Sequence, residues 1–316
     1  DEGMDVNAYG IGFRAARSEI IPNRGERLEC EECGACIDIC PVGALTSGTY
    51  RYKTRPWELT YTGTICNHCG DGCKTTLSVR NNEIVRANNR DHSGINAEFL
   101  CVKGRFGWDF VNSGQRLTTP LIRRNGKQEP ASWEEALTLT ADRLKAVLAE
   151  HGPECVAVIG SNRTSNEENY LLGRFARTVL GTNNLDHHRT ADFSSLVGAL
   201  TSTGATDRYA TVEDISRASS LLLIGNDPTH QHPLLAYQIR QAVRQHGARL
   251  YVINSLEIKL HRQASFHLKV QPQAEAEAVR ALAAEQAPPA DLPWDLKEGF
   301  TTLREKLGKE SDVVIL

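Results

Sequence analysis

Eight of the nine cysteines fall into two groups whose spacing is suited to binding iron. The first group reads Cys30-x2-Cys33-x2-Cys36-x3-Cys40-Pro41. In this bacterial ferredoxin run, three thiolates bind one 4Fe-4S cluster and the fourth thiolate binds another. Residues 1–29 contain no cysteine. We therefore expect the missing ligands upstream of Asp1; if the chain is complete, Cys40 instead closes a single local cluster.

The second group contains a complete set of four thiol ligands. It reads Cys66-x2-Cys69-x3-Cys73-x27-Cys101. Gly70 and Gly72 are expected to let the backbone come close to a cluster and turn N–H groups toward sulfide. Structural zinc sites usually take their ligands from two separated pairs of residues, and the spacing of neither cysteine group closely resembles that arrangement. Both groups therefore favour iron–sulfur clusters that carry electrons, with a structural zinc module as an alternative.

Local patterns indicate the elements that position these cysteines. Thr75–Val79, Asn81-Asn82 and Ile84-Val85 predict a β-hairpin that packs beneath the second group. The long return to Cys101 implies a small subdomain. We expect a loop-rich, ferredoxin-like α+β segment at 1–60 and a small β-rich 4Fe-4S domain at 61–117.

From Leu117 onward, strands and helices alternate, which is typical of parallel βαβ units. Ser132 with Glu135 and Ser165 with Glu168 are capping boxes. Helices are predicted at 132–150, 165–180, 233–246, 274–284 and 295–307, with a linker at 287–290. Strands are predicted at 155–159, 221–224, 249–253 and 313–316. The pattern predicts a doubly wound, parallel-sheet α/β domain over 118–316 that is incomplete at its C-terminal end.

Composition limits the classes of function. The 316 residues carry a formal net charge of −3 and are 40% hydrophobic, which indicates a folded protein and no nucleic-acid partner. The longest apolar runs are much shorter than the roughly 20 residues that cross a bilayer, so no direct membrane insertion is expected. Phosphate-binding glycine motifs and a serine nucleophile elbow are absent. The cysteine spacing favours metal ligation in a reducing compartment over disulfides.

Several other side chains could do chemistry. Cys155 begins a predicted strand and is expected in the core. His187 and His188 follow an Asn-Asn pair, and His230 and His232 follow a predicted parallel strand, where α/β folds bind ligands. A structural role is favoured for all four histidines. His261 and His267 lie in a basic stretch and are expected to be solvated.

The chain resembles a known family along nearly its whole length. Residues 40–46 and 51–59 resemble the iron–sulfur region of the large G chain of bacterial NADH-quinone oxidoreductase (complex I). Residues 64–105, with Cys101-Val102-Lys103-Gly104-Arg105, resemble the 4Fe-4S domain that this chain shares with molybdopterin oxidoreductases. Residues 118–316, including 165–170 and 181–184, resemble the first α/β part of the molybdopterin domain.

The sequence departs from that of formate dehydrogenases in the loops that contact their molybdenum cofactor. Their loop carries a cysteine or selenocysteine ligand to the metal, whereas residues 186–193 contain no such ligand and Asp192 falls near its position. Asn254-Ser255-Leu256 replaces their Asp-Pro-Arg, and residues 271–274 replace their Pro-Gly-Thr-Asp. Because three expected contacts change together, we do not expect molybdopterin.

The resemblance implies an electron-transfer subunit of a proton-translocating NADH-quinone oxidoreductase. Cys30, Cys33 and Cys36 would bind one 4Fe-4S cluster with an upstream cysteine, and Cys40 would bind its neighbour. Cys66, Cys69, Cys73 and Cys101 would bind a further cluster, with Lys103 close to it. The implied partners are subunits of the peripheral arm, including a flavin-bearing NADH-oxidising subunit, in the cytoplasm at the inner (plasma) membrane. The alternative is the α subunit of a molybdopterin-dependent formate dehydrogenase, with a carboxylate or histidine at the metal.

Overall fold

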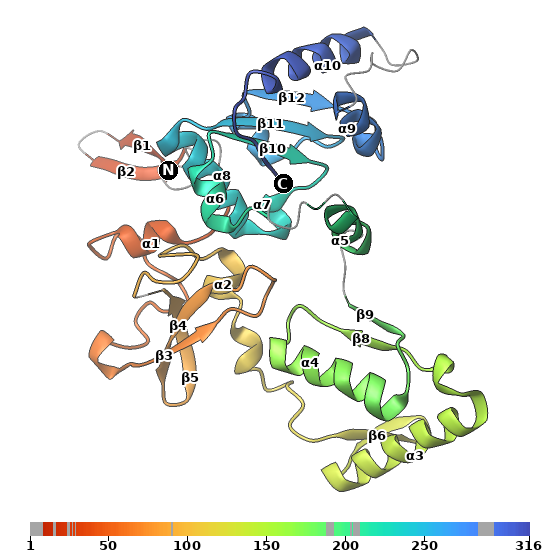
Figure 1. Cartoon of the computed structure of the whole chain (residues 1–316). Coiled ribbons are helices and arrows are strands. Elements are labelled where there is room, and N and C mark those ends of the chain that lie inside the picture. The colour runs from red at the N-terminus through yellow and green to blue at the C-terminus, as the bar shows by residue number, and fades with distance from the viewer. Residues whose placement is uncertain are drawn as a thin grey trace.

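The computed structural model describes residues 9–14, 17–23, 26, 28, 30–89, 91–187, 193–202, 204, 209–283 and 294–316. The predicted linker at 287–290 lies outside them. Within this part of the chain, two small segments that carry the two cysteine groups are followed by α and β structure (Figure 1). No helix in these ranges is both long and apolar enough to cross a membrane.

The first segment is short and irregular. An antiparallel hairpin of β1 (Tyr9–Arg14) and β2 (Arg17–Pro22) precedes α1 (Ala35–Ile39), and a 3₁₀ turn, η1, covers Pro56–Glu58. Gly34 precedes α1 with φ of 73°, a left-handed conformation that favours glycine. In the first cysteine group, Cys30 and Cys33 therefore precede a short helix, Cys36 lies on it and Cys40 is its C-cap.

The second segment is built on a three-stranded antiparallel sheet. The strands are β3 (Thr60–Ile65), β4 (Lys74–Arg80) and β5 (Glu83–Asn88). The predicted hairpin is confirmed as β4–β5, and both turn residues, Asn81 and Asn82, have positive φ, as a tight hairpin turn requires. The chain returns through α2 (Val102–Phe106) and a 3₁₀ turn, η2 (Asp109–Val111).

Residues 118–187 contain the two helices with predicted capping boxes. The elements are β6 (Leu121–Arg124), β7 (Lys127–Pro130), α3 (Trp133–His151), η3 (Pro153–Cys155), β8 (Val158–Gly160), α4 (Asn166–Phe175), a π-helical turn η4 (Ala176–Leu180) and β9 (Leu185–His187). The capping box of Ser165 and Glu168 is complete. At α3, Ser132 accepts from the Glu135 N–H, but the Glu135 carboxylate pairs with Arg124. That predicted box is therefore half formed.

The third region is a three-layer α/β unit. Its elements are α5 (Phe193–Ser202), α6 (Val212–Arg217), β10 (Ser220–Ile224), α7 (Pro228–Gln231), α8 (Pro233–His246), β11 (Arg249–Asn254), η5 (Lys259–Gln263), β12 (Phe266–Lys269), α9 (Glu275–Ala283), α10 (Trp294–Leu307) and β13 (Val314–Ile315). The four strands are parallel, in the order β12-β11-β10-β13.

Alternate side chains of the central strands point to opposite faces of this sheet. Leu221 and Leu223 of β10 join a core cluster with α6 and α8, whereas Leu222 joins a second cluster with α9 and α10. Helices therefore cover both faces, and the predicted doubly wound α/β arrangement is confirmed here. Because both faces are buried, β10 and β11 are continuous apolar runs.

The expectation of one sheet across 118–316 is wrong for the strands that the structure describes. β8 and β9 pair with each other in a separate two-stranded parallel sheet (Figure 1). The predicted core position of Cys155 is also wrong, since its side chain is exposed. Pro153 begins a 3₁₀ turn that contains Cys155, so the strand starts only at Val158.

Candidate iron–sulfur site

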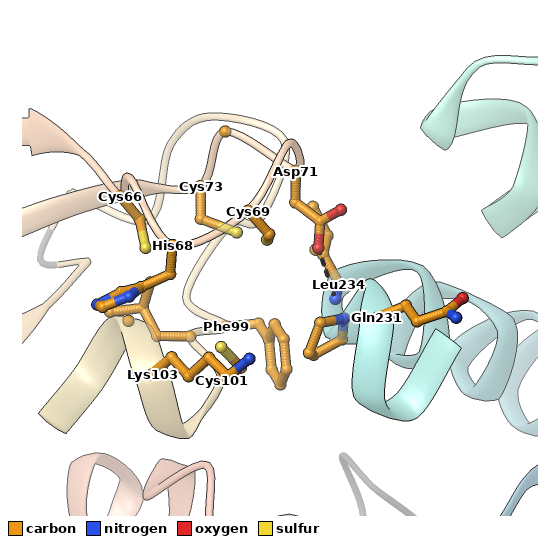
Figure 2. Close-up of a pocket in the computed structure, with 14 residues that line it drawn as sticks. Cys66, His68, Cys69, Asp71, Cys73, Phe99, Cys101, Lys103, Gln231 and Leu234 are labelled. Carbon is orange, nitrogen blue, oxygen red and sulfur yellow. Dashed lines mark hydrogen bonds between the residues drawn. The ribbon is translucent and has the colours of Figure 1, made fainter. Parts of the chain in front are cut away.

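The four cysteines of the second group line a single cavity (Figure 2). Cys66 follows β3, Cys73 precedes β4, Cys69 lies in the turn between them, and Cys101 is the N-cap of α2. The Cys66 N–H donates to the Cys73 carbonyl at 2.8 Å, which closes the turn. The four thiols thus come from the β3–β4 connection and from the start of α2, which lie side by side at the cavity.

The donor set of this cavity suits a 4Fe-4S cluster. Its empty volume is about 420 Å³, part of it open to solvent. Four thiol donors converge on it, and soft thiolates are the ligands that iron–sulfur clusters use. Apolar side chains of Phe99, Leu100 and Leu234 form part of the lining. A cluster bound here would be shielded from water on these sides.

Burial controls the protonation of these thiols. It raises the pKa of Cys69 to about 11, and it raises the pKa values of Cys66 and Cys73 as well, with further contributions from neighbouring negative charges. Without a metal, Cys66, Cys69 and Cys73 are therefore neutral thiols at pH 7. Iron binding must displace their protons, so metal loading is coupled to proton release.

Lys103 and Gly72 also belong to this site. Lys103 of α2 lines the cavity beside the cysteines, where the sequence placed it (Figure 2). Gly72 has φ of 65°, which explains glycine at this position, and a Cβ there would meet no atom within 4 Å. The turn is therefore open on the side of Gly72.

The ferredoxin-type cysteines lie around α1. Cys33 is buried before the helix, and its pKa is raised by burial, with smaller contributions from Cys36 and Cys30. The Tyr9 hydroxyl lies 3.2 Å from the Cys36 Sγ. Backbone hydrogen bonds from Leu45 and Val42 lower the pKa of the Cys40 thiol.

The two cysteine groups are neighbours in space. Cys33 and Cys73 belong to one buried apolar cluster with Phe99, Leu100 and Leu234. Leu234 comes from α8, so the α/β unit contributes to the same cluster. No pattern in the sequence indicated this contact.

Helix α8 contacts the second group through Asp71. The Asp71 carboxylate lies 2.9 Å from His232 Nδ1 and accepts a hydrogen bond from the Leu234 N–H at 3.3 Å. The aromatic rings of Phe99 and Tyr237 stack with centroids 4.5 Å apart. The His232 pKa is raised by its hydrogen bond to Asp71. His232, for which a structural role was favoured, therefore joins the α/β unit to the cysteine turn.

Helix α8 also contacts the ferredoxin segment. Arg240 is 1% exposed and pairs with Glu31 at 2.9 Å, and Lys259 lies 3.5 Å from the same carboxylate. Glu31 directly follows Cys30. One helix thus supports both cysteine groups.

The remaining candidate histidines differ in their surroundings. His230 and His187 have exposed side chains, and His188 and Asp192 lie outside the described residues. The prediction that His261 and His267 are solvated is wrong: their rings stack at 3.7 Å and are partly buried. Burial lowers the pKa of both imidazoles.

Asn254 ends β11 at the sheet edge that carries the altered cofactor motif. Its Nδ2 donates to the Asn226 carbonyl at 2.9 Å, and its Oδ1 accepts from the Leu256 N–H at 2.9 Å. Asn254 therefore stabilises the loops at the carboxyl ends of β10 and β11.

Fold and site together define an iron–sulfur protein with a doubly wound α/β domain. Three family models match: the 4Fe-4S binding domain at 27–46, the molybdopterin oxidoreductase Fe4S4 domain at 59–113 and molybdopterin oxidoreductase at 116–285. The last match alone covers more than half of the chain. The chain belongs to the molybdopterin oxidoreductase family.

Curated relatives extend the likeness. The G 2 subunit of an NADH-quinone oxidoreductase of Rhizobium meliloti is 37% identical over 94% of this chain and 34% of its own length. The α subunit of an NADPH-Fe(3+) oxidoreductase of Geobacter sulfurreducens is 34% identical over 89% of this chain and 33% of its own length. A putative formate dehydrogenase of Bacillus subtilis is 36% identical over 69% of this chain and 22% of its own length. The chain spans about a third of the first two relatives. The resemblance to the complex I G chain is confirmed.

A solved structure supports the fold. Acetylene hydratase from Pelobacter acetylenicus superimposes with a TM-score of 0.58 at 18% identity, covering 80% of this chain and 39% of that one. The match at 116–285 gives no support to the expectation that the chain lacks molybdopterin.

Proposed function

We propose that this chain is an iron–sulfur electron-transfer part of a proton-translocating NADH-quinone oxidoreductase. The observation that carries the proposal is the cavity lined by Cys66, Cys69, Cys73 and Cys101, with Cys33 in the adjoining apolar cluster. The identity of 37% to a G chain of that enzyme, over 94% of the present chain, supports the choice among redox enzymes.

In this proposal, residues 61–117 form the domain that binds a complete 4Fe-4S cluster. Such a cluster, when bound, takes up and releases one electron. The thiols of the second group hold it, and Phe99 and Leu234 exclude water from its surroundings. The ammonium group of Lys103 supplies positive charge at the cavity and favours the more negative, reduced state.

Residues 1–60 form the ferredoxin-like domain in the same proposal. Cys30, Cys33 and Cys36 share one cluster with an upstream cysteine, and Cys40 serves its neighbour. Residues 118–316 are the scaffold on which both domains are mounted, because α8 contacts each of them. Electrons enter from a flavin-bearing NADH-oxidising subunit of a cytoplasmic assembly on the inner membrane and leave toward quinone.

The proposal is tested on the full-length protein, purified anaerobically. Iron and acid-labile sulfide are quantified, and the sample is titrated reductively with EPR detection. We expect several 4Fe-4S signals, reducible by NADH only when the flavin-bearing partner is present. A colourless protein that contains zinc and gives no reducible signal contradicts the proposal and supports a structural zinc module.

A second candidate is the catalytic subunit of a molybdopterin-dependent formate dehydrogenase. The observation in its favour is the 36% identity to a putative formate dehydrogenase, together with the molybdopterin oxidoreductase match. Metal analysis with pterin extraction separates the two candidates. Stoichiometric molybdenum or tungsten with a pterin favours the second, whereas iron without either metal favours the first.

A further inference from the structure

We propose that Arg105 is a positioning residue that ties the two cysteine groups together and sets the reduction potentials of both clusters. The inference rests on the proposed function, since it presumes that both groups hold clusters. Nothing in the cysteine pattern assigns a role to Arg105. Its contacts with both segments carry the inference.

The backbone of Arg105 is hydrogen-bonded to a cysteine of the second group. It lies on α2, and its N–H donates to the carbonyl of the ligand Cys101 at 3.0 Å. Its side chain crosses to the ferredoxin segment, where Nε donates to the Cys33 carbonyl at 2.5 Å. Nη1 pairs with Asp38, which lies between Cys36 and Cys40. One residue therefore contacts a ligand of each group.

The contact depends on a close approach at Gly34. A Cβ on Gly34 would lie 2.4 Å from Arg105 Cδ and 2.8 Å from Phe106 Cζ. Gly34 also has φ of 73°, so both the space and the backbone favour glycine. The ferredoxin run is thus shaped to receive the Arg105 side chain.

The charges around Arg105 leave an excess of positive charge. Asp38 pairs with Arg105 and also with Arg86 at 2.6 Å, so one carboxylate faces two guanidinium groups. Arg105 is 4% exposed, and its Nη2 has no hydrogen-bond partner in the part of the chain that the structure describes. Water screens a buried charge only weakly, so it acts strongly on nearby redox groups.

The sign of the effect follows from the charge of the reduced cluster. Reduction adds one negative charge, which a nearby guanidinium stabilises. Removing the positive charge should therefore lower the potentials of both clusters. Removing the negative charge of Asp38 should raise the potential of the ferredoxin-type cluster.

The test compares Arg105→Gln, Asp38→Asn and Arg105→Lys in the full-length protein by EPR-monitored redox titration. Arg105→Gln and Asp38→Asn break the same ion pair, so a merely structural role predicts similar changes in both variants. A charge effect predicts shifts of opposite sign at the ferredoxin-type cluster. Arg105→Lys keeps the charge and should leave the potentials close to those of the wild type.

Arg80→Gln is the matched control. The Arg80 guanidinium donates to the Lys53 carbonyl at 2.7 Å and pairs with Glu58 at 3.2 Å, which is the same chemistry between the same two segments. Arg80 contacts neither cysteine group in these bonds, so both potentials should stay unchanged in Arg80→Gln. Should Arg105→Gln fail to assemble, Asp38→Asn and Arg105→Lys decide.

The outcomes separate the inference from the proposed function. Wild-type protein without reducible signals overturns the proposed function and the inference with it. Normal wild-type signals, with potentials in Arg105→Gln and Asp38→Asn that are unchanged or shifted in the same direction, overturn the inference alone. Opposite shifts, with Arg80→Gln unchanged, support it.

Discussion

The Asp71 carboxylate, in the turn between Cys69 and Cys73, lies 2.9 Å from Nδ1 of His232, which is 161 residues away in the chain. The same carboxylate accepts a hydrogen bond from the backbone of α8. The cysteine turn is therefore held against the α/β unit by a partly buried polar contact. Such contacts position the site as much as the cysteine spacing does.

Asp71→Ala should loosen the attachment of α8 to the cysteine turn. Asp71 is 5% exposed, and its loss leaves the Leu234 N–H without its partner, at a cost of about 1–3 kcal/mol. Chemical denaturation and hydrogen exchange of the α8 amides measure the effect. Asp91→Ala is the control, because Asp91 lies at the surface and its hydrogen-bond partners Lys74 and Ser93 belong to its own domain. Equal effects of the two substitutions would contradict this role for Asp71.

The Glu31–Arg240 pair should behave differently in single and double variants. Glu31→Ala leaves the buried Arg240 guanidinium without its partner, which costs about 3–5 kcal/mol. Arg240→Met should cost less, because Lys259 still faces Glu31. In the double variant, neither charge is left unpaired, so the loss in unfolding free energy should be smaller than the sum. Strict additivity in this cycle would mean that the pair does not join the two segments.

Gly34→Ala should disturb the contact between the ferredoxin run and α2. The new Cβ meets Arg105 and Phe106, and the positive φ adds strain of about 1–3 kcal/mol. Gly43→Ala in the same segment is the control, since a Cβ there meets no atom within 4 Å. Thermal unfolding and iron content should change in Gly34→Ala only. A Gly34→Ala protein with normal stability and iron content would show that the close approach is not needed.

Glu310 should make the stability of the α/β unit depend on acid pH. Its carboxylate is almost fully covered, and hydrogen bonds from Arg249 and Tyr251 lower its pKa. Because the folded-state pKa is lower than the unfolded value of about 4.3, the stabilisation is complete above that value. It is lost as pH falls through the folded-state pKa. Denaturation curves of wild type and Glu310→Gln should therefore differ at pH 7 and converge in acid; a constant difference would contradict the assignment.

Local signals predicted much of the fold. Helix α8 begins and ends as expected, at Pro233 and His246, because proline starts it and Gly247 ends it in a left-handed conformation. The hairpin at Asn81-Asn82 and the capping box at Ser165 follow from equally local chemistry. The cysteine spacing likewise predicted that Cys66, Cys69, Cys73 and Cys101 form one group.

Contacts between distant segments could not be predicted. Glu31 and Arg240 are 209 residues apart, and no periodic pattern connects them. Cys155 was placed in the core from its residue type, but a 3₁₀ turn begun by Pro153 leaves it exposed. His261 was expected in solvent because its neighbours are basic, whereas packing places it against His267. Tertiary packing decided the first and third of these cases, whereas the local turn at Pro153 decided the second.

In the proposed function, Cys66, Cys69, Cys73 and Cys101 bind one redox-active cluster that is separate from those of the ferredoxin run. EPR spectroscopy of reduced Cys73→Ala in the full-length protein tests it most directly. The variant should lose one 4Fe-4S signal and the corresponding iron, and it should keep the ferredoxin-type signals. Loss of every signal together, or of none, would contradict the claim.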